Sequence, residues 1–501
     1  MPSLLSATKS MCLYAAWTVM NAATARLVNK IVPDVYMDEP FHITQAQAYC
    51  RGEWSTWDPK ITTPPGLYIL SVAQNYILRL ICNVPNLRLT NFLFLQITPL
   101  VIALLLRSTR TLNHTPGRSS NISQDSRGSS LAFDTLGFTL AAFPVLWFFG
   151  FLYYTDVGSA VGIVATVLLA REGKHWWAAM IGILSTFFRQ TNIIWLGYAF
   201  LSFTARAFTD PNLPSSIQIH LRSVPSKLDV QRLKTIRRPA DQASPVDLLS
   251  LFFVYLRAIP NLISSFLPYL FALIGFVGFI VWNGGIVLGD KSNHVPSTHV
   301  PQIFYFIAFA TAFAWPALLS GKKYGAIGLV KAVIKRMAGT WRRAIATCGL
   351  LIIIEFFIWK YTMHHPFLLS DNRHYTFYLW RRVMMAHPSV PYLLGPIYLI
   401  CGWTWWVRLA PTSPLIDLLI LPLFTLITLL PTPLLEPRYF IIPFLLLRIQ
   451  LAKEPSRGEW AQLVEFSWYA LINIVTMWVF LFAPREPTRG AEDLGIVRFM
   501  W

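Results

Sequence analysis

Long apolar windows recur from one end of the chain to the other, and no other feature of the sequence restricts the fold so strongly. Residues 345–363, which contain the run LLIIIEFFIW, are one example. A window of about 17 to 25 apolar residues can cross the roughly 30 Å hydrocarbon core as a helix. A membrane β-barrel would instead show segments of about 10 residues with alternating polarity. The pattern predicts an all-α integral membrane protein with about 12 to 14 membrane segments.

Composition agrees with a membrane protein and argues against a nucleic-acid-binding protein. Hydrophobic residues make up 54% of the chain and charged residues only 13%, which is too apolar for a soluble protein of this length. The net charge of +18 comes from Lys and Arg gathered in a few loops, such as residues 107–127 and 322–343. Cytosolic loops of membrane proteins show this bias. We therefore expect the lipid bilayer as a partner and no nucleic acid.

The windows predict a single polytopic domain over residues 1–501 with one ambiguous segment. Residues 11–32 are interpreted as a retained first span, although AATA at 22–25 resembles a signal-peptidase site. Segment 64–82 opens with two prolines and carries Gln74, Asn75 and Arg79, so it is either an interfacial or a membrane helix.

Loop charge favours the interfacial alternative for segment 64–82. All basic loops, including the hydrophilic insert 207–258, then fall on the cytosolic side, as the positive-inside rule prefers. The sequons at Asn113 and Asn121 would lie in the cytosol and stay unmodified. The opposite, non-cytosolic side, called lumenal below, would receive the chemically varied loops, which are residues 33–63, 153–158, 284–301 and 364–389.

Cysteine usage and the missing motifs exclude several classes of function. Five scattered cysteines imply neither a disulfide framework nor a metal cluster, and only Cys50 and Cys82 are candidates to pair. The sequence has no Walker loop, HExxH, GxSxG or CxxC motif. ATP-driven transport, zinc proteolysis and serine hydrolysis therefore lack their required residues.

The first lumenal loop, residues 33–63, contains an acidic pair in the stretch YMDEPFH. Asp38 and Glu39 directly follow the first apolar window, and His42, Trp54 and Trp57 lie in the same loop. A carboxylate at the edge of the hydrocarbon reaches polar substrates and can act as a general base. The alternative is that these acids and tryptophans are ordinary interfacial residues.

A second lumenal loop, residues 364–389, carries cations on the face where the positive-inside rule predicts few. Arg373, His374, Arg381 and Arg382 stand here. Their chemistry suits either a bound phosphate or anchoring to lipid headgroups.

Three further charged residues lie at or inside predicted spans. Arg438 in EPRYFIIP and Arg189 in FFRQTN stand near the lumenal ends, where Glu436 and Asp156 are available as partners. Glu355 lies mid-span, where it is either functional or neutralised by a proton or a neighbouring helix.

Several unusual segments follow one another along the chain: YMDEPFHITQAQAYC, WDPKITTPPGLY, FLYYTDVGS, FFRQTNIIW, NGGIVLGD, FLLSDNRHYTFYLWRR, EPRYFIIPFLLLR and RFMW. Together they closely resemble the endoplasmic-reticulum alpha-1,2-glucosyltransferase family, which adds the last glucose to the dolichol-linked N-glycan precursor. The matches run from about residue 36 to residue 501, while residues 207–250 match no part of the family pattern. Pro40 departs from that pattern, which has an aliphatic residue after the acidic pair.

The resemblance implies a glycosyltransferase-C type bundle in the endoplasmic-reticulum membrane with its active site at the lumenal face. It implies dolichyl-phosphate-glucose as donor, the diglucosylated dolichyl-diphosphate-linked oligosaccharide as acceptor, and inversion at the transferred sugar. Asp38 is the first candidate for the base and Glu39 the second. No metal cofactor is expected, because side-chain cations can stabilise a leaving group with a single phosphate.

The remaining candidate residues divide by role. The expected phosphate ligands are Arg373 and His374, with Arg381, Arg382 and Arg438 in reserve. The expected substrate-binding residues are His42, Trp54, Trp57, Tyr153, Asp156, Arg189, Asp371 and Tyr375.

Two non-enzymatic hypotheses compete with glycosyl transfer. A lipid-linked sugar transporter or flippase would show internal repeats and ionisable groups near the midplane, and only Glu355 fits that description. A noncatalytic assembly subunit would tolerate replacement of both Asp38 and Glu39.

Overall fold

A computed structural model describes residues 2–110, 135–210, 213, 227–244, 246–289, 291, 296–321, 324–452, 459–486 and 496–501. Within these residues the protein is helical, and β-structure is limited to three isolated bridges. The predicted sequons at Asn113 and Asn121 lie outside the described residues.

The helices follow one another in this order: α1 (Pro2–Ile31), α2 (Glu39–Cys50), α3 (Gly66–Leu78), α4 (Val84–Arg110), α5 (Thr135–Ala141), α6 (Pro144–Phe149), α7 (Asp156–Arg171), α8 (His175–Thr186), α9 (Asn192–Thr209), α10 (Lys227–Ile236), η3 (Ala240–Gln242), α11 (Val246–Asn283), α12 (Gln302–Leu318), α13 (Ala326–Ala338), α14 (Trp341–Tyr361), α15 (Pro366–Ser370), α16 (Tyr375–Leu379), η5 (Trp380–Met384), α17 (Val390–Leu393), α18 (Gly395–Leu409), α19 (Leu415–Leu429), η6 (Pro437–Phe440), α20 (Ile441–Leu451) and α21 (Glu459–Phe482).

Four of the described helices are long and apolar enough to cross a membrane, namely α4, α11, α14 and α21. This is fewer than the 12 to 14 segments that the apolar windows predict. Two causes are visible. The apolar window at 131–150 is described from residue 135 onward, and this part is divided between α5 and α6, because Pro144 lacks an amide hydrogen and begins a new helix. All of α20, from Ile441 to Leu451, is buried inside the protein, so its apolar residues contact other helices.

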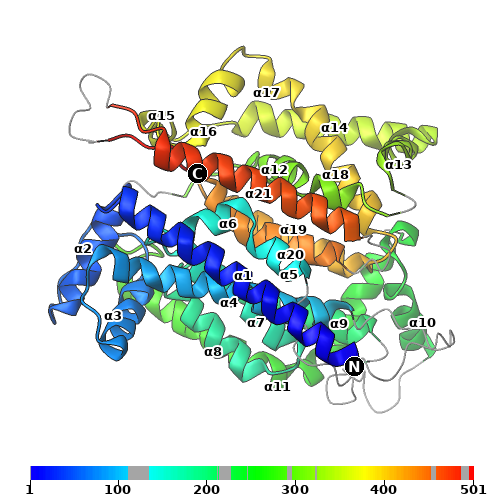
Figure 1. The fold of residues 1–501 in the computed structure, drawn as a ribbon. Coiled ribbons are helices and arrows are strands. Elements are labelled where there is room, and N and C mark those ends of the chain that lie inside the picture. The colour runs from blue at the N-terminus through cyan, green and yellow to red at the C-terminus, as the bar shows by residue number, and fades with distance from the viewer. Residues whose placement is uncertain are drawn as a thin grey trace.

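The bundle has two distinct ends (Figure 1). Helices α2, α3, α15 and α16 gather at one end, and the N-terminus, α10 and α13 lie at the other. The helices between them pack on a core of aromatic rings, with Phe143 stacked on Phe444 at 4.3 Å between centroids. The polar loops that carry the candidate residues are thus held on a rigid frame.

Cys50 and Cys82, the two cysteines that the sequence leaves as candidates to pair, form a disulfide. Cys50 is the last residue of α2 and Cys82 follows α3, so the disulfide holds the two ends of the segment 51–81 together. Helix α3 has 13 residues. At 1.5 Å per residue it is about 20 Å long, which is too short for the roughly 30 Å hydrocarbon core.

The insert 207–258 is more ordered in its described part than the hydrophilic connector that the sequence predicts. Helix α11 begins at Val246, and Val254 and Ala258 are buried one helical turn apart. Before it, Ala240 donates a backbone hydrogen bond of 2.9 Å to the Ser413 carbonyl. Apolar side chains at helical spacing give this segment a packing face that its overall polarity conceals.

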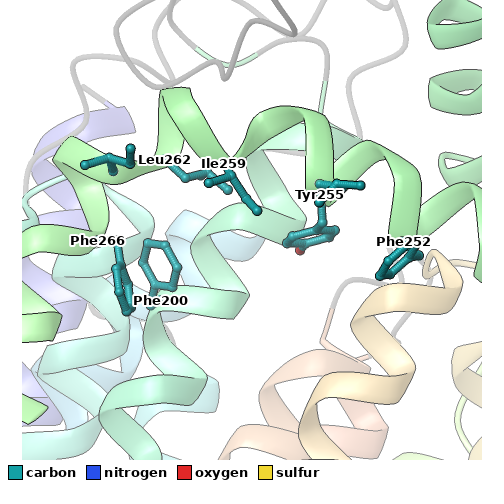
Figure 2. Close-up of a pocket in the computed structure, with 8 residues that line it drawn as sticks. Phe200, Phe252, Tyr255, Ile259, Leu262 and Phe266 are labelled. Carbon is teal, nitrogen blue, oxygen red and sulfur yellow. The ribbon is translucent and has the colours of Figure 1, made fainter.

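An apolar groove of about 430 Å³ lies where α11 passes α9 (Figure 2). Phe200, Phe252, Ile259 and Phe266 are among its lining residues. The lining hydroxyl of Tyr255 bonds to Thr204 at 2.9 Å. This groove offers no acid or cation to a sugar phosphate, so the polar end of the bundle is the better candidate for chemistry.

Candidate active site

Asp38 is the N-cap residue of α2. Met37 has a φ of 60°, an uncommon conformation for a residue other than glycine. Pro40 sits in the first turn of the helix, where its missing amide hydrogen costs nothing. The Asp38 carboxylate makes no capping bond to α2, which leaves it available to other groups.

Arg438 is the partner of Asp38 and the centre of a charged cluster. Its guanidinium lies 3.1 Å from Asp38, 2.6 Å from Glu436 and 3.9 Å from Asp156. It also lies over the Tyr154 ring, 5.3 Å from the centroid. Glu436, which the sequence offers as an available partner, thus pairs with Arg438. We call Asp38, Asp156, Arg189, Glu436 and Arg438 the Arg438 cluster.

Arg189 completes this cluster from the turn between α8 and α9. It pairs with Asp156 at 2.9 Å, one of the acids that the sequence offers as available partners, and lies over the Tyr439 ring at 5.2 Å. Asp156 opens α7, where the positive end of the helix dipole favours an acid.

The charges around Asp38 set its protonation state. Enclosure by protein would raise the pKa of its carboxyl group, but Arg438, His42 and His374 together lower the pKa below the usual value. The Asp38 side chain is nevertheless 41% exposed. It is therefore an ionised carboxylate that a substrate can reach.

His42 lies one helical turn after Asp38 on α2. Its Nδ1 atom is 2.6 Å from the Tyr68 hydroxyl, and its ring contacts the Tyr154 ring edge-on at 6.3 Å. Burial lowers the pKa of His42, and the nearby Asp38 only partly opposes this shift. The imidazole is thus held neutral at neutral pH.

The loop of residues 371–375 approaches Asp38 from a distant part of the chain. Arg373 pairs with Asp371 at 2.7 Å, and its guanidinium lies 6.0 Å from the centroid of the Tyr36 ring. His374 is close enough to act electrostatically on Asp38. The later loop therefore approaches Asp38 through His374, and Arg373 approaches the first loop through Tyr36.

Glu39, the second candidate for the base, lies in a different environment from Asp38. It is fully buried and pairs with Arg88 at 2.5 Å. Its oxygens also accept the backbone amides of Tyr36 at 3.0 Å and Tyr153 at 2.7 Å. This geometry opposes the prediction of Glu39 as a base, because its oxygens are occupied and no substrate reaches them.

Four other predicted site residues, Arg381, Arg382, Tyr153 and Tyr375, pack against or bond to neighbouring side chains. Arg381 and Arg382 are exposed and lie over the rings of Phe377 and Tyr378 on neighbouring turns. The Tyr153 hydroxyl is buried and bonds to Ser71 at 2.8 Å. The Tyr375 ring packs on Trp501, with 5.3 Å between centroids.

The two tryptophans of the first loop differ in exposure. Trp54 is 56% exposed and lies against the Tyr49 ring at 5.0 Å. Trp57 is partly buried against Tyr68, and its indole nitrogen is buried without a hydrogen-bond partner.

Comparison with known proteins identifies the family. The profile of the DIE2/ALG10 family matches residues 32–449. The chain belongs to this family. It is 35% identical to a rat protein named Dol-P-Glc:Glc(2)Man(9)GlcNAc(2)-PP-Dol alpha-1,2-glucosyltransferase over 94% of both chains. A human protein of the same name is 34% identical over 94% of both chains, and one from Arabidopsis thaliana is 31% identical over 95% of this chain and 96% of its own. No solved structure matches the chain.

The part that matches the DIE2/ALG10 family includes residues that sequence reasoning missed. Arg88 holds Glu39, Tyr154 lies under Arg438, and Tyr36 lies under Arg373. Arg88 is a lone cation at the start of an apolar window, which is a weak signal. The two tyrosines lie inside the quoted segments YMDEPFHITQAQAYC and FLYYTDVGS, but nothing else in the sequence singles them out. Residues 496–501, beyond the matched range, also reach this site.

Proposed function

We propose that this protein transfers glucose from dolichyl-phosphate-glucose to the dolichyl-diphosphate-linked oligosaccharide that carries two glucoses, in alpha-1,2 linkage. The names of its relatives supply this donor and acceptor. The observation that carries the proposal is the ionised, accessible carboxylate of Asp38, which contacts Arg438 and lies near His374.

Asp38 serves as the general base in a single displacement. The acceptor hydroxyl oxygen attacks the anomeric carbon and forms the new glycosidic bond while the bond to the phosphate oxygen breaks. Asp38 takes the hydroxyl proton, and dolichyl phosphate leaves with the electron pair. Attack from the face opposite the leaving group converts a beta donor into an alpha product.

Arg373 and His374 receive the donor phosphate. Arg373 uses its Nε and Nη2 atoms on Asp371, and the rest of its guanidinium fork can bind an oxyanion. Arg438 already forms ion pairs with three carboxylates. We therefore assign it as the counter-ion of Asp38 and not as a ligand of the donor phosphate. Because the leaving group has one phosphate, these cations replace a metal.

Other residues near the Arg438 cluster bind the sugar or shape the site. The neutral imidazole of His42 offers a hydrogen bond to a sugar hydroxyl, and the exposed face of Trp54 offers a stacking surface. Glu39 acts as a positioning residue, since its carboxylate accepts the backbone amides of Tyr36 and Tyr153 and so holds the two loops that carry these residues.

We further propose a glycosyltransferase-C type bundle in the endoplasmic-reticulum membrane with a lumenal site. The Cys50–Cys82 disulfide supports this orientation, because disulfides persist in oxidising compartments. The same bond supports an interfacial α3, since both of its flanks lie on one side. The flippase alternative is weaker, because the relatives are named as glucosyltransferases and Glu355 is the one mid-span ionisable candidate that the sequence offers.

The test is a transfer assay with purified protein in detergent, synthetic dolichyl-phosphate-glucose and acceptors that carry one, two or three glucoses. We expect transfer only to the acceptor with two glucoses, and an unchanged rate with EDTA. Equal use of all three acceptors would contradict the acceptor assignment. A strict divalent-metal requirement would contradict the roles of Arg373 and His374.

A further inference from the structure

Residues 497–501, which we call the strap, lie against the loop that carries Arg373 and His374. The Met500 amide donates to the Arg373 carbonyl at 3.0 Å, and the Tyr375 amide donates to the Met500 carbonyl at 3.2 Å. The His374 Nδ1 atom lies 2.7 Å from the Trp501 carbonyl. Three successive residues of the loop are therefore bonded to the strap.

The strap also holds the loop that carries Asp38. The Tyr36 hydroxyl donates to the Arg498 carbonyl at 2.5 Å and accepts the Arg498 amide at 2.7 Å. Tyr36 is 7% exposed, and its ring lies under the Arg373 guanidinium. A single tyrosine two residues before Asp38 thus connects the strap to both loops.

The strap is anchored to the bundle through Arg498 and Val497. The Arg498 side chain donates to the carbonyls of Phe480 and Leu481, at 2.9 Å each, where α21 ends. These carbonyls have no partner within a helix, and a cation is favoured at this helix end. Val497 exchanges two backbone hydrogen bonds with Arg485, at 2.8 and 3.0 Å.

The loop has little support of its own. The two helices that flank it, α15 and α16, have only five residues each, and isolated helices of that length are unstable. Arg373 and His374 lie between them, so apart from the Arg373–Asp371 pair their positions depend on contacts made outside the loop. The strap supplies backbone contacts on both sides of His374.

We infer that the strap is a positioning element that holds Arg373 and His374 at a fixed place relative to Asp38, so that the donor phosphate and the base meet one sugar. This inference rests on the proposed function. It predicts a selective effect. Loosening the strap should raise the donor KM or lower kcat, whereas acceptor binding should stay largely intact.

The experiment measures donor and acceptor KM, kcat and thermal unfolding for two variants in the full chain. Tyr36→Phe removes the hydroxyl and keeps the ring, and Met500→Pro removes the amide that bonds to Arg373. The matched controls are Tyr76→Phe, at a tyrosine 85% exposed on α3, and Ile496→Pro, next to the strap at a side chain 60% exposed.

We expect both strap variants to raise the donor KM or lower kcat by about tenfold or more, because misplacement of binding groups by about 1 Å has effects of this size. Acceptor KM and unfolding temperature should stay close to those of the unmodified protein and the controls. Loss of stability with equal changes for both substrates would overturn the inference and leave the strap a structural element.

A double-mutant cycle makes the test independent of folding. If the strap acts through Arg373, then Tyr36→Phe should change donor use little in an Arg373→Ala background. An equal effect of Tyr36→Phe in both backgrounds would overturn the inference. If the unmodified protein transfers no glucose, the proposed function fails before any variant is measured, and the inference fails with it.

Discussion

Asp38 and Glu39 are adjacent carboxylates that form ion pairs of opposite character. Glu39 and Arg88 are 0% and 2% exposed, and two backbone amides occupy the remaining Glu39 lone pairs. Asp38 and Arg438 are 41% and 13% exposed. A sealed pair with all its bonds made can only hold the fold, whereas an open pair can exchange a bond with a substrate.

The same contrast appears between two arginines of consecutive helices, Arg438 in η6 and Arg448 in α20. Arg438 pairs with the partly exposed Asp38. Arg448 pairs with Glu465 inside the bundle, where both side chains are at most 1% exposed. Charge in a membrane protein is therefore a poor guide to function without its exposure. The comparison predicts which substitutions change turnover and which change stability.

The largest effect on turnover is expected at the open carboxylate. Asp38→Asn keeps the size of the side chain but removes the base, so kcat should fall about 10²- to 10⁴-fold. The unfolding temperature should stay near that of the unmodified protein. Turnover in detergent and thermal unfolding measure the two quantities, with Asp34→Asn at an exposed acid of the same loop as the control. Unchanged turnover would remove Asp38 from its assigned role.

The largest effect on stability is expected at the sealed pair. Arg88→Met leaves Glu39 buried without its cation, and loss of one partner of such a pair costs about 3 to 5 kcal/mol. Thermal unfolding of purified protein would measure the loss. Combining Arg88→Met with Glu39→Gln should recover part of it, since the buried charge is then gone. An unfolding temperature equal to that of the unmodified protein would show that the pair is not sealed in solution.

Much of the site could be predicted from the sequence, because its signals are local. Asp38, Arg373 and His374 stand out against apolar surroundings, and the disulfide partners Cys50 and Cys82 flank one short segment. The sequence could not distinguish Asp38 from Glu39. That difference depends on Arg88, which is 49 residues away from Glu39 and approaches it only through tertiary packing.

The fold could be predicted in class but not in detail. Two apolar stretches of the sequence, residues 345–363 and 461–483, correspond closely to α14 and α21. Hydropathy alone could not tell an apolar helix that faces lipid from one such as α20 that is buried among other helices, since both are apolar on all sides. The segment RFMW marks residues 498–501 in the sequence, but the partners of the strap could not be predicted, because it bonds to both loops through backbone atoms that any residue possesses.

A smaller effect, on pH dependence, tests why the open pair is ionised. Arg438 lowers the pKa of Asp38, so activity that needs the carboxylate persists as pH falls through the usual carboxyl range. Arg438→Gln removes this cation, which raises the pKa of Asp38 and moves the acid limb of kcat/KM to higher pH. Arg438→Lys keeps the charge and should shift the limb less. Identical acid limbs in both variants would mean that another group controls the profile.

The smallest effect extends the comparison to Trp54 and Trp57, which are three residues apart. Trp54 is 56% exposed beside Tyr49, so Trp54→Ala should cost only the stacking of a sugar ring, about 0.5 to 1.5 kcal/mol, or roughly a 2- to 10-fold rise in acceptor KM. Trp57 packs on Tyr68 with its indole nitrogen buried, so Trp57→Ala should instead lower the unfolding temperature. Trp54→Phe keeps an aromatic face and should restore most of the affinity. If Trp54→Ala lowers the unfolding temperature as much as Trp57→Ala does, exposure does not distinguish substrate-binding from structural side chains at this end of the bundle. The distinction between open and sealed ion pairs would then lose its support there.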